Sequence, residues 1–545
     1  MDKCFKFVLV VSCLALVNGV TAQPLSKNKG FTRQDTLRGS LRPERNWWNV
    51  TRYDILVEPD IPNKTISGYN DITFDVVGKS TRLMQIDLQE PMEIVKVENL
   101  LYKNQKIDFK REGNVFWLNA PKSGRQGKIR IYYKGTPRAA VNPPWDGGWI
   151  WKKDSLGRPF VSVACQGLGA SVWMPCKDHQ SDEPDKGATL TIIAPGDLTG
   201  VGNGRLVEKK NVRPGYTAWT WKVVNPINNY DIIPYLAHYV NFTDTIQGEK
   251  GKLDASYWVL DYNLERAKKQ FAIVRPMIKC FESWMGPYPF YEDSYKLVEA
   301  PHLGMEHQSA VAYGNGYQNG YRGKDLSGTG LGLYWDFIVV HESGHEWFGN
   351  SITAKDVADM WIHEGFTTYA EVMYIEDTKG VQAGSEYMIG REKRIQNDIP
   401  VIGHYGVNRE GSADMYDKGA AMLHTIRQLL QDDKRFKEML REISHKFYHK
   451  TVTTKQIEDF MTSYTGLHLQ KVFDQYLRSK DVPVLEFKQE GNVYLYRWAS
   501  CINGFDMKVR LANGTWLQPE REYQTLSARE KPEVDKNFFI SVKYL

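Results

Sequence analysis

Two histidines one helical turn apart, with a glutamate beside the first, constrain this chain more than any other feature of its sequence. They lie in the stretch HESGHEWFGN, residues 341 to 350. Residues at positions i and i+4 share one face of a helix, so the rings of His341 and His345 can point at a single ion. We expect the helix to end near Gly349 and Asn350, a pair that commonly ends helices.

A third residue completes the ligand set of a catalytic zinc site. Zinc in such sites takes three protein ligands and keeps one position for water. Glu364 lies nineteen residues after His345 in a second helical stretch, and a returning helix can bring its carboxylate back to the two histidines. Glu342 is rotated off the ligand face, where it can act as a general base toward water at the metal. We therefore predict one zinc ion per chain, against the alternative of two unrelated histidines on an ordinary helix.

The order of the sequence patterns predicts a multidomain α+β protein. Short alternating runs such as YDILVEP and ATLTIIAP, broken by Gly, Asn, Asp and Pro, indicate a β domain over residues 46–250. Apolar residues at helical spacing dominate residues 251–482, with one strand at 294–300. Alternation returns over residues 483–545, which we expect to form a small β domain. Residues 23–45 are polar and rich in Gly, Ser, Arg and Lys, which favours a linker or flexible arm.

Residues 1–22 are typical of a secretory signal peptide. Lys3 and Lys6 precede an apolar run over residues 7–17, and small residues lead to a cleavage point that we expect after Ala22. Two alternatives stay open, an uncleaved membrane anchor and lipid attachment at Cys13. No later segment is apolar for long enough to span a bilayer. We therefore expect a secreted or periplasmic protein without a transmembrane segment, or else a lipoprotein.

The charge and the cysteine content of the chain bear on two further questions, nucleic-acid binding and disulfide formation. The chain has 70 Lys and Arg residues against 65 Asp and Glu, and this small, dispersed excess gives no case for nucleic-acid binding. Export would permit disulfides. The mature chain would keep four cysteines that could pair or stay as buried thiols, the first two being close enough in sequence to pair: Cys165, Cys176, Cys280 and Cys501.

The metal motif and several other stretches resemble the zinc aminopeptidases of family M1. HESGH followed by Glu364 within WIHEGFTTYAE is similar to that family's HExxH-x18-E signature, which is highly specific. The resemblance covers about residues 46 to 545 and includes VACQGLGASVWMPCKDHQSDEP, YDKGAAMLHTIRQLL and FDQYL. It implies an N-terminal β domain, a thermolysin-like catalytic domain and a C-terminal β-sandwich. Many relatives carry a further helical C-terminal domain that covers the cleft; we expect the short form without it, and an open cleft.

The resemblance also implies substrate-binding residues beside the metal. PHLGMEHQSA, residues 301 to 310, stands where the family has Gly-x-Met-Glu-Asn on the edge strand of the cleft, and a substrate backbone can pair with such an edge. Gly304 and Met305 match edge-strand positions, and Glu306 matches the glutamate that binds the free α-amine of the substrate. This sequence departs from the family pattern at Leu303, Gly304 and His307. These departures weaken the inference that the family's backbone contacts to substrate are present here more than they weaken the role of the Glu306 carboxylate.

Two further residues match functional positions of the family. Gln166 aligns with a Gln or Glu that contacts the substrate amine, which a neutral amide can do through its oxygen. Tyr416, in MYDKG, matches the tyrosine that donates a hydrogen bond to the tetrahedral intermediate, where charge develops on the former carbonyl oxygen. Glu371 shares a helix face with Glu364 and could orient a ligating histidine. A surface or core role is equally well supported for Glu371, so we leave it out of the predicted site.

Together these residues predict an exported zinc aminopeptidase whose partners are peptides with a free N-terminus. Three alternatives stay open: a zinc endopeptidase, which the carboxylate of Glu306 disfavours; an epoxide hydrolase on the same scaffold; and a non-catalytic peptide-binding protein. The predicted site comprises catalytic, substrate-binding and metal-ligating residues, in that order: Glu342 and Tyr416; Glu306, Gln166, Gly304 and Met305; and His341, His345 and Glu364.

Overall fold

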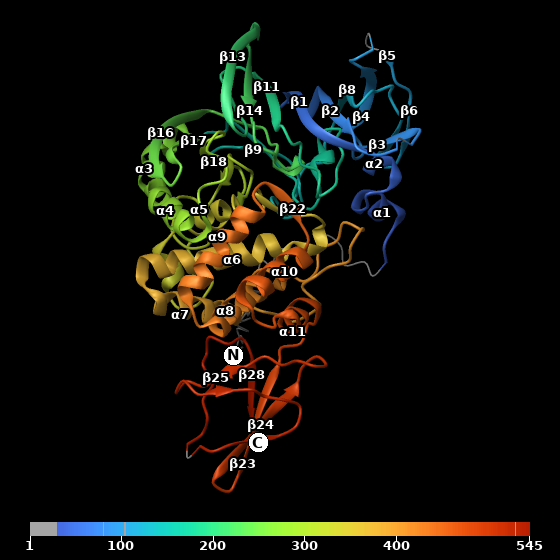
Figure 1. Ribbon diagram of the computed structural model, residues 1–545. Helices are drawn as coiled ribbons and strands as arrows, with labels where there is room; N and C mark the ends of the chain where they lie inside the picture. The colour runs from blue at the N-terminus through green and yellow to red at the C-terminus, as the bar shows by residue number, and fades with distance from the viewer. Residues whose placement is uncertain (1–29, 80, 103–104, 529) are drawn as a thin grey trace, which may run out of the picture.

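The computed structural model describes residues 30–79, 81–102, 105–528 and 530–545 of the chain. The signal peptide predicted over residues 1–22, and Cys13 within it, lie outside the described residues. Three parts follow one another along the chain (Figure 1): a β-rich N-terminal part, a mainly helical middle part and a small C-terminal group of strands. This order confirms the predicted multidomain α+β fold.

An eight-stranded sheet forms the frame of the N-terminal part. Its strand order is β13-β14-β11-β1-β2-β8-β4-β5, in which β1 and β11 run parallel. Tyr53, Ile55 and Val57 of β1 are buried while the residues between them are not, because successive side chains of a strand point to opposite faces. The strands are β1 (Trp48–Asp60), β2 (Thr65–Val76), β4 (Glu93–Asn99), β5 (Gln105–Lys106), β8 (Gln126–Gly135), β11 (Ala188–Pro195), β13 (Arg205–Arg213) and β14 (Tyr216–Lys222).

Two smaller sheets close this part around one apolar core. One has the order β3-β7-β6 and the other β12-β15-β10-β9. Their buried residues share one cluster with the large sheet, in which Trp48, Phe74 and Trp149 are fully enclosed. Because β10 ends just before Gln166, this core supports the loop that carries Gln166. The strands are β3 (Leu83–Asp87), β6 (Phe109–Glu112), β7 (Val115–Asn119), β9 (Gly148–Lys153), β10 (Pro159–Ala164), β12 (Thr199–Val201) and β15 (Tyr235–Ala237).

The described part of the predicted linker is a folded segment. Residues 30–46, which we call the N-terminal strap, contain two short helices, and a capping box at Thr32 begins the first of them. The prediction of a linker or flexible arm is therefore wrong for residues 30–45. A polar composition does not show that such a segment has bonding partners far along the chain. The helices are α1 (Arg33–Gly39) and α2 (Pro43–Asn46).

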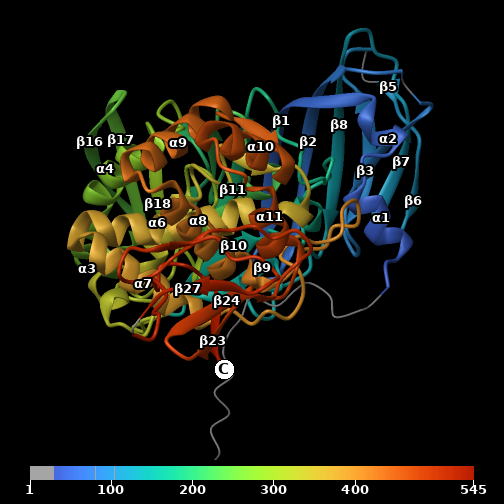
Figure 2. The same cartoon turned by 60° about the horizontal axis from the view of Figure 1, so that its bottom comes forward.

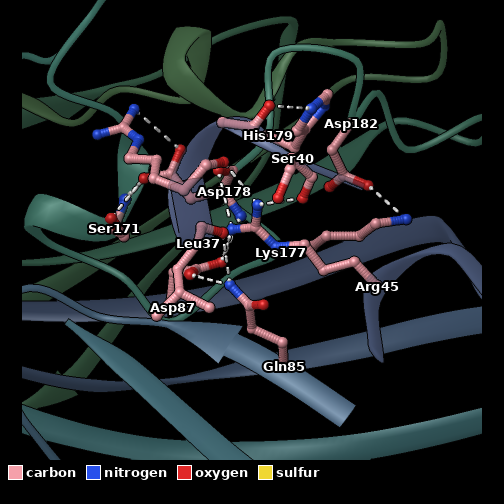
Figure 3. Close-up of polar contacts among 12 residues, drawn as sticks. Leu37, Ser40, Arg45, Gln85, Asp87, Ser171, Lys177, Asp178, His179 and Asp182 are labelled. Carbon is pink, nitrogen blue, oxygen red and sulfur yellow. Dashed lines mark hydrogen bonds and ion pairs between the residues drawn. The ribbon is translucent and has the colours of Figure 1, made fainter. Parts of the chain in front are cut away.

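A buried ion pair anchors the N-terminal strap to the β-rich part. Arg45 is fully buried, and its guanidinium donates to Asp87 Oδ2 at 2.5 Å and to the carbonyl oxygens of Arg38 and Asp178 at 2.6 and 3.2 Å (Figure 3). Gln85 donates to the other oxygen of Asp87 at 2.9 Å. Both charges are thus paired and hydrogen-bonded, which is the condition under which charges are tolerated inside a protein.

A five-stranded sheet opens the catalytic part, and it starts earlier than the sequence patterns indicate. Its order is β16-β17-β18-β20-β19, and β16 pairs with β17 along its whole length. The boundary predicted at residue 250 therefore falls inside a hairpin, and the sheet begins at Tyr239. The outer strand β19 is the edge that carries Gly304 and Met305. The strands are β16 (Tyr239–Gly248), β17 (Gly251–Leu260), β18 (Tyr295–Glu299), β19 (Gly304–Met305) and β20 (Val311–Tyr313).

The helix α6 forms the centre of the catalytic part. Its residues from Trp361 to Ile375 are all buried, as expected of a helix enclosed by others, and it packs against α4, α5, α7 and α8. A short parallel pair of strands joins residues 352–354, after α5, to residues 450–452, after α9. The elements are α3 (Leu264–Gln270), α4 (Val274–Met285), α5 (Phe337–Gly344), β21 (Ile352–Ala354), α6 (Trp361–Lys379), α7 (Val381–Glu392), α8 (Asp417–Leu430), α9 (Asp433–Lys446), β22 (Lys450–Val452), α10 (Thr454–Thr465) and α11 (Gln470–Phe473).

The metal-motif helix α5 ends at Gly344, before the predicted end at Gly349. Beyond Gly344 the chain continues in wider turns, one of which is closed by a hydrogen bond from the Asn350 amide to the His345 carbonyl at 2.9 Å. His345 nevertheless keeps right-handed helical dihedral angles. It therefore still lies one turn after His341, as the spacing requires.

The C-terminal part holds a four-stranded sheet of order β27-β24-β23-β28 and a separate two-stranded pair. Figure 2, in which the lower end of the molecule comes forward, shows these strands in front of the catalytic helices. Leu485, Trp498 and Phe538 belong to the same buried cluster as those helices, so the C-terminal strands pack directly on the catalytic part. The strands are β23 (Val484–Glu490), β24 (Val493–Ser500), β25 (Val509–Arg510), β26 (Trp516–Leu517), β27 (Gln524–Leu526) and β28 (Ser541–Tyr544).

The four cysteines of the described chain are free thiols, and three of them are buried. The thiol of Cys165 donates to the carbonyl of Tyr230 at 3.4 Å, and that of Cys280 to the carbonyl of Met373 at 3.6 Å. Of the two possibilities left open by the sequence, the structure thus has the unpaired one. Among the described residues no helix is both long and apolar enough to cross a membrane.

Candidate active site and metal centre

Three predicted ligands meet between α5 and α6. The Nε2 atoms of His341 and His345 lie 3.5 and 3.3 Å from Oε2 of Glu364, and ligand atoms of all three residues lie within 4.8 Å of one another. All three side chains are buried. Within the described residues this is the only such group of three His, Cys, Asp or Glu side chains.

The surroundings of the three ligands fit a zinc ion. Nδ1 of His341 lies 2.7 Å from Glu371 Oε1, and Nδ1 of His345 lies 3.0 Å from the carbonyl of Phe348. These acceptors place a proton on each Nδ1, which leaves each Nε2 lone pair free to coordinate a metal. Glu364 Oε2 is buried without a hydrogen-bond partner, as a carboxylate kept for a metal would be. Two imidazoles and one carboxylate are a common ligand set of catalytic zinc.

Glu371, which was considered from the sequence but left out of the predicted site, holds the ring of His341. Its second oxygen accepts hydrogen bonds from Tyr387 and Arg391, both at 2.6 Å, and Arg391 in turn pairs with Asp417 at 2.6 Å. The Arg391 charge and these hydrogen bonds keep the pKa of Glu371 below its ordinary value in spite of burial. The position of Glu371 on the ligand face of α6 was the sequence signal for this contact.

Glu342 lies beside the ligands without joining them. A Cβ atom on Gly304 would lie only 2.9 Å from Glu342 Oε1, so the carboxylate of the helix faces the edge strand β19, and a glycine there makes room for it. Burial raises the pKa of Glu342 to about 7, against the lowering effect of the two histidines. Glu342 and Gly304, the latter a departure from the family pattern, therefore lie in contact with each other.

Glu306 is a buried carboxylate at the wall of the site. Gln166 Nε2 and the Tyr230 hydroxyl donate to its Oε1 at 2.5 and 3.0 Å, and the side chain is 2% exposed. Burial raises its pKa above the ordinary value. Asn350 donates to the Glu306 carbonyl at 2.8 Å and fixes the backbone at this point. Tyr230 was not found from the sequence, where nothing distinguishes it among 30 tyrosines.

The loop that carries Gln166 is held from three directions. Asn408 donates to the carbonyl of Gly167 at 3.1 Å, and Gln89 donates to that of Leu168 at 2.8 Å. Arg38 of the N-terminal strap also donates to the Leu168 carbonyl. The strap and the N-terminal sheets therefore position a predicted substrate-binding residue opposite the metal ligands.

Tyr416 lies over one of the ligands. Its ring stacks on that of His341 with the ring centres 6.1 Å apart and an angle of 24° between the planes. Burial and the nearby Glu364 raise the pKa of Tyr416 well above its ordinary value, so its hydroxyl keeps its proton at neutral pH and can donate a hydrogen bond. The half-buried side chain keeps access to the cavity described next.

One cavity of about 580 Å³ unites the nine predicted site residues, a volume within the usual range for small-ligand sites. It contains a cation-binding group of ligands, a carboxylate suited to moving a proton, a hydroxyl donor and the outer strand of a sheet. Such an arrangement can bind an extended chain end and hydrolyse a bond next to the metal. The residues are Gln166, Gly304, Met305, Glu306, His341, Glu342, His345, Glu364 and Tyr416.

Comparison with known families places the metal site within a recognised domain. Residues 333–476 match the family model described as the Peptidase family M1 domain. The chain contains a peptidase family M1 domain. This M1 domain includes all three ligands, Glu342 and Tyr416, while Glu306 and Gln166 precede the matched range. The cavity therefore combines residues of the M1 domain with residues of the parts before it.

Several curated proteins are similar to this chain. Leukotriene A-4 hydrolase of Xenopus laevis is 24% identical over 337 residues, 58% of this chain and 52% of its own length. Aminopeptidase Ey of Gallus gallus is 24% identical over 334 residues, 56% of this chain and 33% of its own length. Glutamyl aminopeptidase of Sus scrofa is 22% identical over 80% of this chain and 48% of its own length. The matches thus span about half of these relatives or less.

Solved structures share the fold around the M1 domain. A crystal structure of an M1 zinc metallopeptidase from Deinococcus radiodurans, in a variant bound to a Tyr-Ser-Ala substrate, superposes with a TM-score of 0.67 at 19% identity. The similarity covers 81% of this chain and 96% of that one. A related two-domain structure bound to L-tryptophan also gives a TM-score of 0.67. The fold of this chain is therefore that of the M1 zinc metallopeptidases.

Proposed function

We propose that this chain is an exported zinc aminopeptidase that removes single residues from peptides with a free N-terminus. The observation that carries the proposal is the environment of Glu306. Its carboxylate is 2% exposed in the wall of the metal cavity, and the side chains that donate to it, Gln166 and Tyr230, are neutral. No lysine or arginine of the described chain forms an ion pair with it. A buried carboxylate without a counter-charge favours a cationic ligand.

The α-amine of a peptide is the cation that suits this position. Its ordinary pKa is about 8, so most of it is charged at neutral pH. A hydrogen bond between charged groups contributes about 1.5–3 kcal/mol. Both protein donors bond to Oε1 of Glu306, so Oε2 keeps its capacity to accept from an ammonium. A substrate peptide that continued beyond Glu306 would have no ammonium group to pair with this carboxylate and no space for its further residues. This disfavours an endopeptidase.

The residues of the chain can perform the remaining steps of peptide hydrolysis. Zinc, when bound, would polarise the scissile carbonyl and lower the pKa of a water molecule. Glu342 can take the proton of the attacking water and pass it to the leaving amine. The Tyr416 hydroxyl can donate to the oxygen that becomes negative in the transition state. The edge strand β19 offers backbone groups to the peptide by strand addition.

Epoxide hydrolysis and non-catalytic peptide binding are the two other functions to compare with this proposal. The similarity to a leukotriene A-4 hydrolase favours epoxide hydrolysis as a second candidate. An epoxide has no α-amine, so a Glu306→Gln variant would keep that activity while it lost aminopeptidase activity. A non-catalytic peptide-binding protein has no need of the Glu342 position, which is retained here together with all three ligands.

Export is the part of the proposal that rests on residues 1–22 alone. The expected mature protein begins at Gln23 after cleavage behind Ala22. Mass spectrometry of the protein recovered from the native compartment checks this point. An intact Met1 or a lipid on Cys13 would contradict cleavage at Ala22.

The test of the proposed activity is kinetic and uses the zinc-loaded enzyme. Aminoacyl fluorogenic amides with a free amine should be hydrolysed, and Glu306→Gln should lower kcat/KM by about tenfold to a hundredfold through the lost charge. Glu342→Gln should keep its zinc and lose several orders of magnitude in kcat. Glu392→Gln, a half-buried glutamate outside the cavity, is the matched control and should behave as the wild type. Unchanged kinetics in Glu306→Gln would contradict the proposal.

A further inference from the structure

One carboxylate in the cavity wall has no assigned role and no partner. Glu410 lines the metal cavity and is half-buried. No hydrogen bond or ion pair joins its side chain to any residue that the structure describes. The neighbouring acids differ: Asp414 accepts from the amides of Gln396 and Asn397 at 2.8 and 2.6 Å, and Asp417 pairs with Arg391.

Glu410 lies on the side of the cavity where the substrate amine would bind. Asn408, two residues earlier, donates to the carbonyl of Gly167 beside Gln166 at 3.1 Å. Burial raises the pKa of Glu410 to about 7, and the charges of Glu364 and Glu306 contribute to the rise. The loop of Glu410 is therefore fixed against the loop of Gln166, in electrostatic range of Glu306.

The cations that line the cavity do not neutralise Glu410. Arg391 pairs with Glu371 and Asp417, both at 2.6 Å, and Arg394 pairs with Asp417 at 3.4 Å. Lys324 is exposed and forms no ion pair with a described residue. Glu410 is thus a half-buried carboxylate without a counter-charge from the described chain, and a cation bound beside it would favour its ionised form.

We propose that Glu410 makes the enzyme prefer peptides whose N-terminal residue is arginine or lysine. The proposal rests on the proposed aminopeptidase function. The α-ammonium group and the first side chain leave the same Cα atom, so an amine held by Glu306 sends its side chain into the surrounding wall. A long basic side chain can reach a second carboxylate there, and arginine can bond to it through two parallel N–H groups. A cavity of about 580 Å³ has room for such a side chain.

The proposal also predicts which N-terminal residues are disfavoured. A first residue with an acidic side chain would bring a negative charge toward Glu410 and Glu306. A neutral side chain of the same length would fill the space but leave Glu410 without a partner. The expected order of kcat/KM is therefore basic first, neutral of equal size second and acidic last.

Pairs of substrates with equal shape and different charge give the test. The zinc-loaded wild-type enzyme should hydrolyse the arginine fluorogenic amide at least about tenfold better in kcat/KM than the citrulline amide, and lysine better than norleucine. Glu410→Gln should bring both ratios near one by losing rate on the basic substrates alone. Glu410→Lys should reverse the order of arginine and glutamate. Glu392→Gln, which is equally half-buried but lies outside the cavity, should leave the ratios unchanged.

The outcomes separate this proposal from the one on which it rests. Equal wild-type rates on arginine and citrulline amides would overturn the preference and leave the aminopeptidase function standing. An equal loss on both substrates in Glu410→Gln would show a structural role for Glu410 and overturn the preference too. Failure on every free-amine substrate would overturn both proposals. The wild-type comparison needs no variant, so it decides the matter even where Glu410→Gln is unstable.

Discussion

Only one of the two ring nitrogens of His341 faces the metal position. Glu371 accepts from the other at 2.7 Å and is itself fixed by Tyr387 and Arg391. Glu371→Gln should keep the fold but weaken zinc binding by about tenfold to a hundredfold, because the neutral amide orients the ring less firmly and makes it less basic. Competition with a chelator measures this affinity. Glu376→Gln, on the same helix but paired with Arg427 instead, is the control and should bind zinc normally; equal affinities in the two variants would contradict this role of Glu371.

At the scale of single residues, spacing along the sequence was sufficient to predict some of the site residues but not all of them. His341, His345 and Glu342 belong to one helix, so helical geometry alone predicts their relative positions. Tyr230, which donates to Glu306, and Glu410, which lines the cavity, belong to segments whose positions depend on packing over the whole fold. No short pattern surrounds either residue, and for that reason neither was predicted.

At the scale of elements, the N-terminal strap depends on one buried charge. Arg45→Ala would leave Asp87 buried without its counter-charge, and we expect the free energy of unfolding to fall by about 3–5 kcal/mol. Urea unfolding followed by tryptophan fluorescence checks this, because Trp47 and Trp48 are buried next to the strap. Arg33→Ala removes a pair with Glu112 that is exposed on both sides and should change stability little. Equal effects of the two substitutions would contradict the anchoring role of Arg45.

Element types were predicted better than element boundaries. The long strand and helix patterns were correct in kind because their buried faces repeat at the periods of strands and helices. The expectation of a single strand within residues 251–482 was wrong, because this range holds β17, β19, β20, β21 and β22 besides β18. The end of α5 was placed too late because hydrogen bonds to the carbonyls of His345, Glu346 and Trp347 continue the winding of the chain without continuing the helix. The strap was missed because Arg45 finds its partner, Asp87, only in the folded protein.

At the scale of the whole molecule, the site is assembled from two parts of the chain. Gln166 and Tyr230 come from the N-terminal part, while the ligands, Glu342 and Tyr416 come from the catalytic part. Zinc binds the folded state alone, so removing it should lower the unfolding temperature, by the equivalent of about 2.7 kcal/mol when zinc exceeds its dissociation constant a hundredfold. Thermal unfolding with chelator and with added zinc measures this. His345→Ala is the control, and an equal response of that variant to zinc would contradict the ligand assignment.

The central claim is that the cavity selects a free N-terminus, and one peptide in two forms tests it directly. The zinc-loaded enzyme is given the same peptide with a free and with an acetylated N-terminus, and mass spectrometry identifies the products over time. Acetylation removes the cation and adds bulk against Glu306, so we expect the free peptide to lose single residues in order and to react about a hundredfold faster or more. Equal rates on the two forms, or internal cleavage before terminal trimming, would contradict the account.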